Sequence, residues 1–337
     1  KLPSINKEVF RIREPSVGAG SFLPFLFKKY AAIPRVIIDA VDIDENSIKN
    51  LKLMMRYIKI PVNFEINYIC KDFLLYDAPY TYDLAIGNPP YARLKNRTPE
   101  LDMRLWNNVN QSTNDLAEIF LEKCMRISDC VALVLNKSIL SSEEYSETYD
   151  LLRRVKIDTV IDFGRYGFTG LSIETIDIII HPKDKPNYTM VHSLKFNKSY
   201  RQRQSYITDN KFPFILLYRD EAFDDVAEKL KFGVFDVFRD RQITKSNTIS
   251  DKGENDLWVL KARNVNDDGS GVAHIAGYDI YINSSIASEL SVYKYVNNPN
   301  VYFTPNMTYN TRVIRSINNV VPDGSVEVLI PKDDVIL

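Results

Sequence analysis

The chain has 337 residues, of which 45% are hydrophobic and 26% charged, and its formal net charge is −1. This length predicts about two domains of roughly 100–200 residues each, with a sizeable apolar core. No apolar run approaches the roughly 18 residues that a membrane span requires, and the N-terminus lacks the apolar segment of a signal peptide. The near-zero net charge excludes a chain that is basic throughout, so any contact with nucleic acid must come from local basic patches.

The few cysteines and histidines do not indicate metal chemistry. There are three of each, and they lack the spacing of a metal site. Cys70 and Cys130 lie in or beside apolar segments, which predicts buried, reduced thiols of a cytoplasmic protein. The chain does not begin with Met and reaches its first motif after only a few residues, so we expect it to be part of a longer protein.

Strand and helix signals alternate along the first half of the chain, which predicts a mostly parallel α/β sheet. The expected strands are residues 10–14, 35–41, 62–69, 82–87, 131–135, 159–163 and 175–180. The expected helices begin near residue 21 or 22, cover residues 45–58, and begin again after a cap at Thr113.

The second half of the chain has a different composition. Residues 195–206 are basic, polar and aromatic, which predicts a linker or the lining of a groove. After Phe212 the apolar runs are short and are separated by turn signals at 267–270 and 322–325. We therefore predict an α/β domain over residues 1–200 and a β-rich α+β domain over residues 207–337.

The most informative motif is the tetrapeptide Asn88-Pro89-Pro90-Tyr91, which follows the apolar strand at 82–87. In open α/β sheets, ligands bind at the carboxyl ends of the strands. The two prolines have no backbone N–H, so the local carbonyl groups stay free to accept hydrogen bonds from a ligand. An amide oxygen and such a carbonyl can together accept the two hydrogens of one planar amino group. An ordinary turn with two prolines is the alternative at this point.

Three further motifs follow the earlier strands in order. The loop Glu14-Pro15-Ser16-Val17-Gly18-Ala19-Gly20 leaves the first strand, and its glycines let the backbone approach a ligand closely. Asp42 and Ile43 follow the second strand, about 20 residues after the glycines, where an acid reaches a ribose hydroxyl. Asp72 and Phe73 follow the third strand and offer an acceptor and an aromatic wall to an adenine ring. Each acid alone is better explained by a helix cap or a turn, but the ordered set predicts a nucleoside pocket.

In sequence and order, these motifs resemble those of the gamma-class DNA adenine-N6 methyltransferases, which are bacterial restriction-modification or orphan enzymes. The resemblance covers residues 10–182 well and the remainder only in layout. It implies an S-adenosylmethionine-dependent, Rossmann-like methyltransferase domain followed by a target-recognition domain. The cofactor-binding residues that it implies are Glu14, Ser16, Gly18, Gly20, Asp42, Ile43, Asp72, Phe73 and Asn88. Residues 114–120 are similar to the helix that lines the family's pocket, but Ala117 stands where an aromatic residue is common.

The resemblance also assigns the tetrapeptide to the target base. Asn88 and Pro89 are implied to hold the two hydrogens of an adenine N6 amino group. An adenine inside a duplex is out of reach, so the base must be flipped out of the stack. Tyr91 is expected to stack on one face of the base and Phe168 on the other, with Tyr166 as the competing aromatic residue. This chemistry requires no metal and no nucleophilic side chain.

Basic residues in three places are the expected DNA contacts. They are Arg93 and Lys95 after the tetrapeptide, Lys195 and Arg201 in the basic stretch, and Arg312 and Arg315 in the second domain. Their side chains suit phosphates or base edges. Each stretch taken alone is also compatible with an ordinary solvated surface.

The sequence thus predicts a site-specific adenine-N6 methyltransferase of double-stranded DNA, with a cognate restriction endonuclease as a further partner. Two other functions stay open. Protein-glutamine N5 methyltransferases of the release-factor type share the Asn-Pro-Pro-Tyr turn, although a second domain after the sheet favours a larger substrate. A methyltransferase-like DNA-binding subunit without activity has the same layout, but the intact tetrapeptide argues against it.

Overall fold

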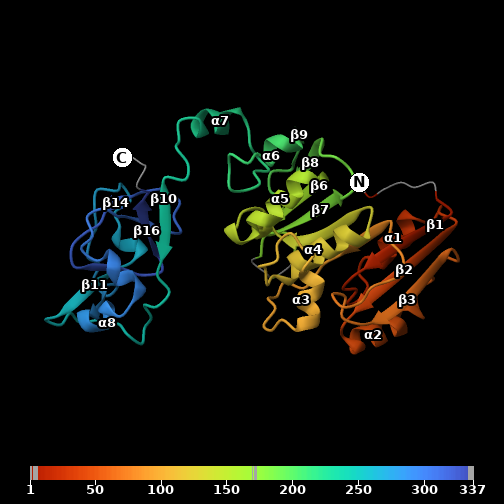
Figure 1. Cartoon of the computed structure of the whole chain (residues 1–337), viewed down its shortest axis with the longest axis horizontal. Helices are drawn as coiled ribbons and strands as arrows, with labels where there is room; N and C mark the ends of the chain where they lie inside the picture. Colours follow the sequence, from red (N-terminus) through yellow and green to blue (C-terminus); the bar gives the residue numbers. More distant parts are fainter. Residues whose placement is uncertain (1, 3–6, 169, 171–172, 333–337) are drawn as a thin grey trace. The chain divides into compact units, whose positions relative to one another are not determined.

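The computed structural model describes residues 2, 7–168, 170 and 173–332, and its contacts divide the chain into two compact units. Unit 1 is Lys1–Glu221 and unit 2 is Ala222–Leu337 (Figure 1). Each unit is described by itself. The division comes later in the chain than the expected boundary between residues 200 and 207, because residues 198–218 pack onto unit 1.

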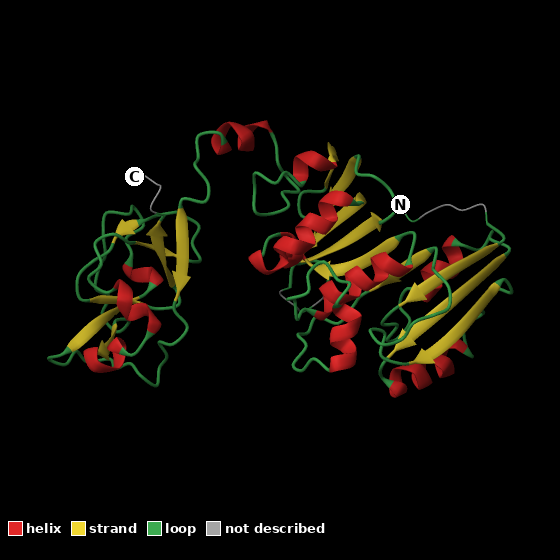
Figure 2. Cartoon of the chain, in the orientation of Figure 1, coloured by secondary structure: helices red, strands yellow, loops and turns green. Residues whose placement is uncertain are grey.

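Unit 1 is built on a nine-stranded sheet with the order β3-β2-β1-β4-β5-β7-β6-β8-β9 (Figure 2). Its strands are β1 (Val9–Glu14), β2 (Arg35–Asp42), β3 (Phe64–Cys70), β4 (Leu84–Gly87), β5 (Val131–Asn136), β6 (Lys156–Gly164), β7 (Thr175–His181), β8 (Tyr188–Ser193) and β9 (Lys198–Arg203). The strands β3, β2, β1, β4 and β5 pair in parallel, whereas β7 runs antiparallel to both of its neighbours. The predicted mostly parallel α/β fold is confirmed, with two reversed strands, β7 and the edge strand β9.

Helices cover both faces of this sheet. They are α1 (Leu23–Lys29), α2 (Glu45–Met55), α3 (Pro99–Leu105), α4 (Leu116–Ile127), α5 (Ser146–Arg154) and α6 (Gln204–Ile207), with the 3₁₀ helices η1 (Lys137–Leu140) and η2 (Glu143–Tyr145). One apolar cluster joins α1 and α2 to one face of the sheet, and a second joins α3, α4 and α5 to the other face. In the part of the chain that the structure describes, no helix is long and apolar enough to cross a membrane.

The helix that we expected to be capped by Thr113 is capped by Asp115 instead. The Asp115 carboxylate accepts hydrogen bonds from the backbone N–H groups of Ala117 (2.8 Å) and Glu118 (3.2 Å). Thr113 supports this cap from outside the helix, because its Oγ1 accepts a hydrogen bond from the Asp115 N–H at 3.1 Å. The first turn of α4 is thereby fixed two residues later than expected.

The basic segment 195–206, which we expected to be a linker or groove lining, is largely an edge strand. β9 pairs antiparallel with β8 along its whole length and ends the sheet. The chain then turns back, and the ring of Tyr218 lies 5.6 Å from that of Phe196 and 5.7 Å from that of Tyr200. Lysine and arginine side chains are common on edge strands, where they discourage further pairing. The composition that suggested a linker is therefore that of a protected sheet edge.

A buried ion pair joins the strands next to the site. Arg13 and Asp39 are each 1% exposed, with 3.7 Å between Nη2 and Oδ2. The Asp39 carboxylate also accepts hydrogen bonds from the Tyr82 hydroxyl (2.6 Å) and the Asn67 amide (2.8 Å). Because buried charge is costly unless it is paired, this cluster ties β1, β2 and β3 to the segment that leads into β4.

The cysteines differ in part from expectation. Cys124 and Cys130 are buried, and burial raises the pKa of each thiol to about 12. Cys70 is exposed, because it is the last residue of β3, an edge strand of the sheet. The prediction that Cys70 is buried was wrong.

Unit 2 is β-rich, as the sequence predicted. It contains the four-stranded sheet β10-β16-β13-β14 and the three-stranded sheet β12-β11-β15. Its elements are β10 (Phe235–Arg239), β11 (Asp256–Leu260), η3 (Ala262–Asn264), β12 (Ile280–Asn283), α8 (Ser284–Ser288), η4 (Ser291–Tyr295), β13 (Tyr302–Pro305), β14 (Ile314–Arg315), β15 (Val320–Pro322) and β16 (Val326–Pro331), and α7 (Glu221–Ala227) lies at the start of the unit. Two small apolar clusters hold the sheets together.

Candidate active site

The predicted site residues meet at one edge of the sheet in unit 1. The strands β3, β2, β1 and β4 are parallel neighbours, so their carboxyl ends lie side by side. Asp72 follows β3, Asp42 ends β2, Glu14 ends β1, and Asn88 follows β4. Residues far apart in the sequence are thereby brought to the edge at which doubly wound sheets bind their ligands.

The loop after β1 adopts a conformation that depends on its glycines. Gly18 and Gly20 have φ angles of +51° and +73°, in the left-handed region. A Cβ atom on Gly20 would lie only 2.6 Å from a side-chain atom of Leu51 in α2. The Gly18 N–H donates a hydrogen bond of 2.8 Å to the Asp42 carboxylate, which holds the loop against the end of β2.

Asp42 and its neighbour Asp44 have different roles. The Asp42 carboxylate accepts hydrogen bonds from the N–H groups of Gly18 (2.8 Å) and Asp44 (2.9 Å). The Asp44 carboxylate caps α2, and its hydrogen bonds to Ser47 and Asn46 hold its pKa below the usual value. Asp42 therefore fixes the glycine loop and keeps further lone pairs for a ligand.

A cavity of about 390 Å³ adjoins Asp42 and contains the expected adenine-binding pair. This Asp72 cavity is lined by Pro15, Ser16, Asp42, Ile43, Asp72, Phe73, Leu74, Asn88, Pro90, Leu94, Leu101, Leu116 and Phe120. Ile43 is 71% exposed and forms one apolar wall. Phe73 is buried and packs against Phe120, with ring centroids 4.8 Å apart. Acidic acceptors between apolar walls suit the ribose and adenine of a nucleoside.

A second cavity, of about 410 Å³, adjoins the glycine loop. This Phe168 cavity is lined by Glu14, Ser16, Val17, Gly18, Ala19, Ser21, Phe22, Asn88, Val134, Phe163, Gly167, Phe168 and Thr175. Ser16 and Asn88 line both cavities. Two ligands that occupy the two cavities would therefore meet at Asn88.

Asn88 has a buried acceptor without a partner. Its Oδ1 makes no hydrogen bond to any residue that the structure describes, while its backbone carbonyl accepts the Ser16 hydroxyl at 3.0 Å. An unpaired buried polar atom costs about 1–3 kcal/mol, and each such atom in a folded protein calls for an explanation. A ligand donor provides one.

Glu14, which lines the Phe168 cavity, also has a buried acceptor without a partner. Its Oε2 is buried and has no hydrogen-bond partner among the described residues. Burial, and then the negative charge of Asp42, raise the pKa of the Glu14 carboxyl well above its usual value. A positively charged ligand group beside Glu14 would stabilise the ionised form and lower this pKa.

Two predicted aromatic residues lie together beside the Phe168 cavity. The rings of Tyr91 and Phe168 have centroids 6.4 Å apart and are nearly perpendicular, at 79°. The Tyr91 hydroxyl donates a hydrogen bond of 3.1 Å to the Val134 carbonyl, which fixes the ring. Tyr166 is 74% exposed, and it is not among the residues that line the cavity. The placement thus favours Phe168 over Tyr166 as the second aromatic residue of the site.

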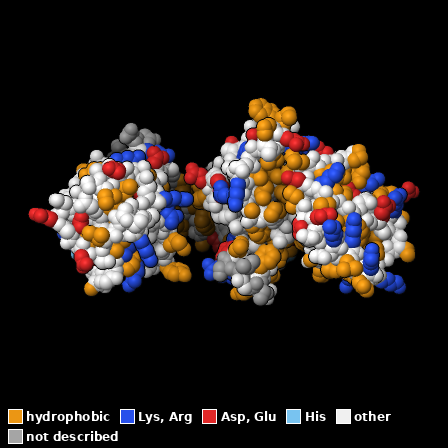
Figure 3. Space-filling view, turned by 90° about the horizontal axis from the view of Figure 1, so that it is seen from below, with side chains coloured by type: hydrophobic (Ala, Val, Ile, Leu, Met, Phe, Trp, Pro, Cys, Tyr) orange, Lys and Arg blue, Asp and Glu red, His pale blue; other side chains and the backbone are white. Residues whose placement is uncertain are grey.

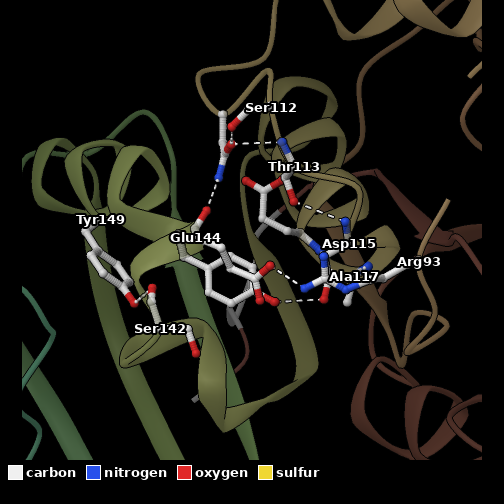
Figure 4. A network of polar contacts seen from close by, with 11 residues as sticks. Arg93, Ser112, Thr113, Asp115, Ala117, Ser142, Glu144 and Tyr149 are labelled. Atoms are coloured by element: carbon white, nitrogen blue, oxygen red, sulfur yellow. Dashed lines mark hydrogen bonds and ion pairs between the residues drawn. The ribbon is translucent and has the colours of Figure 1, made fainter. Parts of the chain in front are cut away.

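Polar contacts hold the segment that follows residues 88–91, the Asn-Pro-Pro-Tyr turn (Figure 4). Arg93 forms an ion pair with Glu144. The carboxylate of Asp115 accepts a hydrogen bond of 2.8 Å from the Tyr145 hydroxyl. Arg93 and Lys95 are both exposed. Because Arg93 is engaged in an ion pair within unit 1, Lys95 is the better placed of the two for an external partner.

The other expected DNA contacts differ in how exposed their side chains are. Lys195, Arg201 and Arg315 are exposed. The side chain of Arg312 is only 9% exposed, and its guanidinium lies 3.3 Å from the Asp267 carboxylate and donates hydrogen bonds to nearby loop carbonyls. Arg312 is therefore held within unit 2, which leaves Arg315 the better placed of the two for an external partner. Figure 3 shows basic side chains interspersed with acidic and apolar ones on the face that it displays.

Several cavity residues were not expected from the sequence. In the Phe168 cavity they include Val134, Phe163 and Thr175, and in the Asp72 cavity they include Leu94 and Leu101. The first three lie on β5, β6 and β7, whose pairing is set by long-range contacts. A reversal of β7 in the sheet was the missing information, because only then does its first residue reach the edge where the other strands end.

Comparison with known proteins agrees with this fold. The family described as Eco57I restriction-modification methylase matches residues 33–168, a segment that includes Asp42, Asp72, the Asn-Pro-Pro-Tyr turn and Phe168. Unit 1 has the fold of an S-adenosylmethionine-dependent methyltransferase. S-adenosylmethionine is accordingly the cofactor that the Asp72 cavity and the glycine loop must be able to bind.

Individual proteins are similar over part of the chain. The Type II methyltransferase M.CvrRI of Paramecium bursaria Chlorella virus XZ-6E is 26% identical over 193 residues, which are 56% of this chain and 46% of that protein. The chain thus spans about half the length of this curated relative. A solved methyltransferase subunit of a type I restriction-modification system from Streptococcus thermophilus has 18% identity and a TM-score of 0.46, covering 66% of this chain and 49% of its own. A class I S-adenosylmethionine-dependent methyltransferase from Listeria monocytogenes has 14% identity and a TM-score of 0.47, covering 56% and 59%.

The residues present fit the cofactor. Asp42 offers acceptors to the ribose hydroxyls, and Asp72 with Ile43 offers an acceptor and an apolar wall to the adenine. The unpaired Glu14 carboxyl lies where a positively charged amino group of the methionine part would stabilise it. When bound, the cofactor supplies an activated methyl group on a sulfonium.

We predict that Asp42→Ala weakens S-adenosylmethionine binding by about 10- to 100-fold, because the ribose loses a charged acceptor and the Gly18 N–H loses its anchor. Isothermal titration of the whole chain measures this. Glu45→Ala is the matched control, since Glu45 is an exposed acid nearby that pairs with Lys49. Equal affinities for the wild type and Asp42→Ala would place the ribose elsewhere.

Proposed function

We propose that this chain is a site-specific DNA methyltransferase that transfers a methyl group from S-adenosylmethionine to N6 of an adenine flipped out of double-stranded DNA. It would act within a restriction-modification system, with a cognate restriction endonuclease as a partner. The observation that carries the proposal is the buried, unpaired Oδ1 of Asn88 in the wall between the two cavities.

The chemistry at Asn88 follows from the target amino group. The N6 lone pair of adenine is delocalised into the ring, so the nitrogen is a poor nucleophile. If its two N–H groups donate to the Asn88 Oδ1 and the Pro89 carbonyl, the charge that develops on nitrogen during transfer is stabilised. Alignment of the amino nitrogen with the methyl group and this preorganised polar contact are the protein's main contributions.

A flipped base fits the recessed position of the site. Asn88 lines the Phe168 cavity and its Oδ1 is buried, so an amino group inside a duplex cannot reach it. The Tyr91 and Phe168 rings stand beside this position, and a stacking contact with a base contributes roughly 1–3 kcal/mol. This is comparable with the few kcal/mol that unstacking costs.

DNA contacts are assigned to the exposed basic residues. We propose that Lys95, Lys195 and Arg201 bind phosphates and that Arg315 in unit 2 contacts DNA bases, while the β-rich unit 2 selects the target sequence. Phosphate contacts set register without carrying sequence information, and base-edge contacts discriminate between sequences. The role of unit 2 rests on its separate fold and on the layout of the chain.

Analysis of modified nucleosides tests the proposal. Duplex DNA of varied sequence is incubated with the full chain and S-adenosylmethionine, digested, and examined by mass spectrometry, with a glutamine-containing peptide as a parallel substrate. We expect N6-methyladenine in the DNA and no methylated glutamine. Methylated cytosine alone, or methylation of the peptide alone, would refute the adenine assignment.

Phe168→Ala should impair capture of the flipped base more than binding of the duplex. The reason is that Phe168 lines the cavity, so its removal takes away a stacking surface. A 2-aminopurine at the target position reports the flipped state by its fluorescence, and gel shift reports total binding. Tyr166→Ala is the control. If the fluorescence changed in Tyr166→Ala and did not change in Phe168→Ala, the stacking role would belong to Tyr166 instead of Phe168.

The double variant Lys195→Ala, Arg201→Ala should weaken binding to every duplex. It should also reduce the salt slope by roughly 0.9 for each phosphate that the variant no longer neutralises. Binding at several salt concentrations, on cognate and scrambled DNA, gives the slope. The matched control is Lys28→Ala, Lys29→Ala, which removes two exposed charges from the last turn of α1. An unchanged slope in the first double variant would show that neither Lys195 nor Arg201 binds a phosphate.

A further inference from the structure

Thr175 lies at the site because its strand is reversed. The carboxyl ends of strands β1 to β4 lie at the edge of the sheet that carries Asn88. Because β7 is antiparallel to β5, its first residue lies at this same edge. Thr175 pairs with Asn136, the last residue of β5. The loop after β6, which carries Phe168, leads directly into this residue.

The hydroxyl of Thr175, like the side-chain oxygen of Asn88, is buried and has no hydrogen-bond partner among the described residues. Thr175 is fully buried, with 0% of its surface exposed, and its Oγ1 has no hydrogen-bond partner among the described residues. It lines the Phe168 cavity together with Asn88, whose Oδ1 is also buried and unpaired. With the Glu14 Oε2, three polar atoms without a partner among the described residues therefore border one cavity, and the Thr175 hydroxyl is the donor among them.

The neighbouring loop packs closely against this hydroxyl at Gly167. A Cβ atom on Gly167 would lie 2.2 Å from the Thr175 Oγ1 and 3.4 Å from the Phe163 Cβ. Only a glycine at position 167 lets the loop lie this close to the hydroxyl without displacing it. The next residue, Phe168, then lines the cavity.

The remaining polar edge of an adenine needs a donor. With both amino hydrogens taken by Asn88 and Pro89, the flanking ring nitrogens N1 and N7 are acceptors. The Ser16 hydroxyl, another donor of this cavity, already donates to the Asn88 carbonyl at 3.0 Å. The Thr175 hydroxyl is not so engaged.

We propose that the Thr175 hydroxyl donates a hydrogen bond to a ring nitrogen of the target adenine and so orients the base for transfer at Asn88. This inference rests on the proposed function and extends it to the specificity of the base pocket. Thr175 is then a substrate-binding residue that the tetrapeptide motif does not include.

The test compares two variants on three bases. Thr175→Val removes the hydroxyl and keeps the branched shape that suits a buried strand, whereas Thr175→Ser keeps the hydroxyl. Single-turnover transfer is measured on duplexes with adenine, 1-deazaadenine or 7-deazaadenine at the target position. Titration with S-adenosylmethionine and a thermal unfolding curve show whether each variant is folded.

We expect Thr175→Val to lose about tenfold or more in transfer to adenine, and Thr175→Ser to recover most of it. On the deaza base that lacks the contacted nitrogen, the wild type should lose a similar factor and Thr175→Val should lose nothing further. The inference would be overturned if, on both deaza bases, the loss caused by Thr175→Val simply multiplied the loss caused by the deaza substitution. In that case no hydrogen bond would join the hydroxyl to either nitrogen. If the wild type does not methylate adenine at all, the proposed function fails first, so the two failures are distinguishable.

Discussion

The candidate active site depends on the direction in which the strands of unit 1 run. Parallel pairing of β3, β2, β1 and β4 places Asp72, Asp42, Glu14 and Asn88 at one edge. The buried pair of Arg13 and Asp39 stabilises that pairing directly behind the site. The reversal of β7 adds Thr175 to the Phe168 cavity, which shares Ser16 and Asn88 with the Asp72 cavity.

The polar atoms around these cavities are arranged for ligands rather than for stability. The oxygens of Asn88, Glu14 and Thr175 that have no partner among the described residues each lower the stability of the fold when no ligand is bound. The Glu14 carboxyl, whose pKa is raised by burial and by Asp42, would gain from a cation. Binding energy from a cofactor and a base is thereby directed to the place where the two meet.

Local sequence patterns predicted the first half of the fold well. The strand before Asn88 is a short apolar run, and in the strand that ends at Glu14 apolar residues alternate with arginines. The site motifs follow both strands immediately. Long-range pairing was not accessible in this way. The basic composition of residues 195–206 hid an edge strand, the role of Thr175 depended on the reversal of β7, and the salt bridge that buries Arg312 joins residues 45 positions apart.

The central claim is that Asn88 serves methyl transfer rather than cofactor binding, and the most direct test measures both in Asn88→Ala. We predict that single-turnover transfer to duplex DNA falls by about 10²–10³, because the variant lacks one preorganised polar group that stabilises the developing charge. The affinity for S-adenosylmethionine should stay close to that of the wild type. Asn96→Ala, an exposed amide in the following segment, should leave both quantities unchanged. Wild-type transfer by Asn88→Ala, or a loss of cofactor affinity that accounts for the slower transfer, would contradict the account.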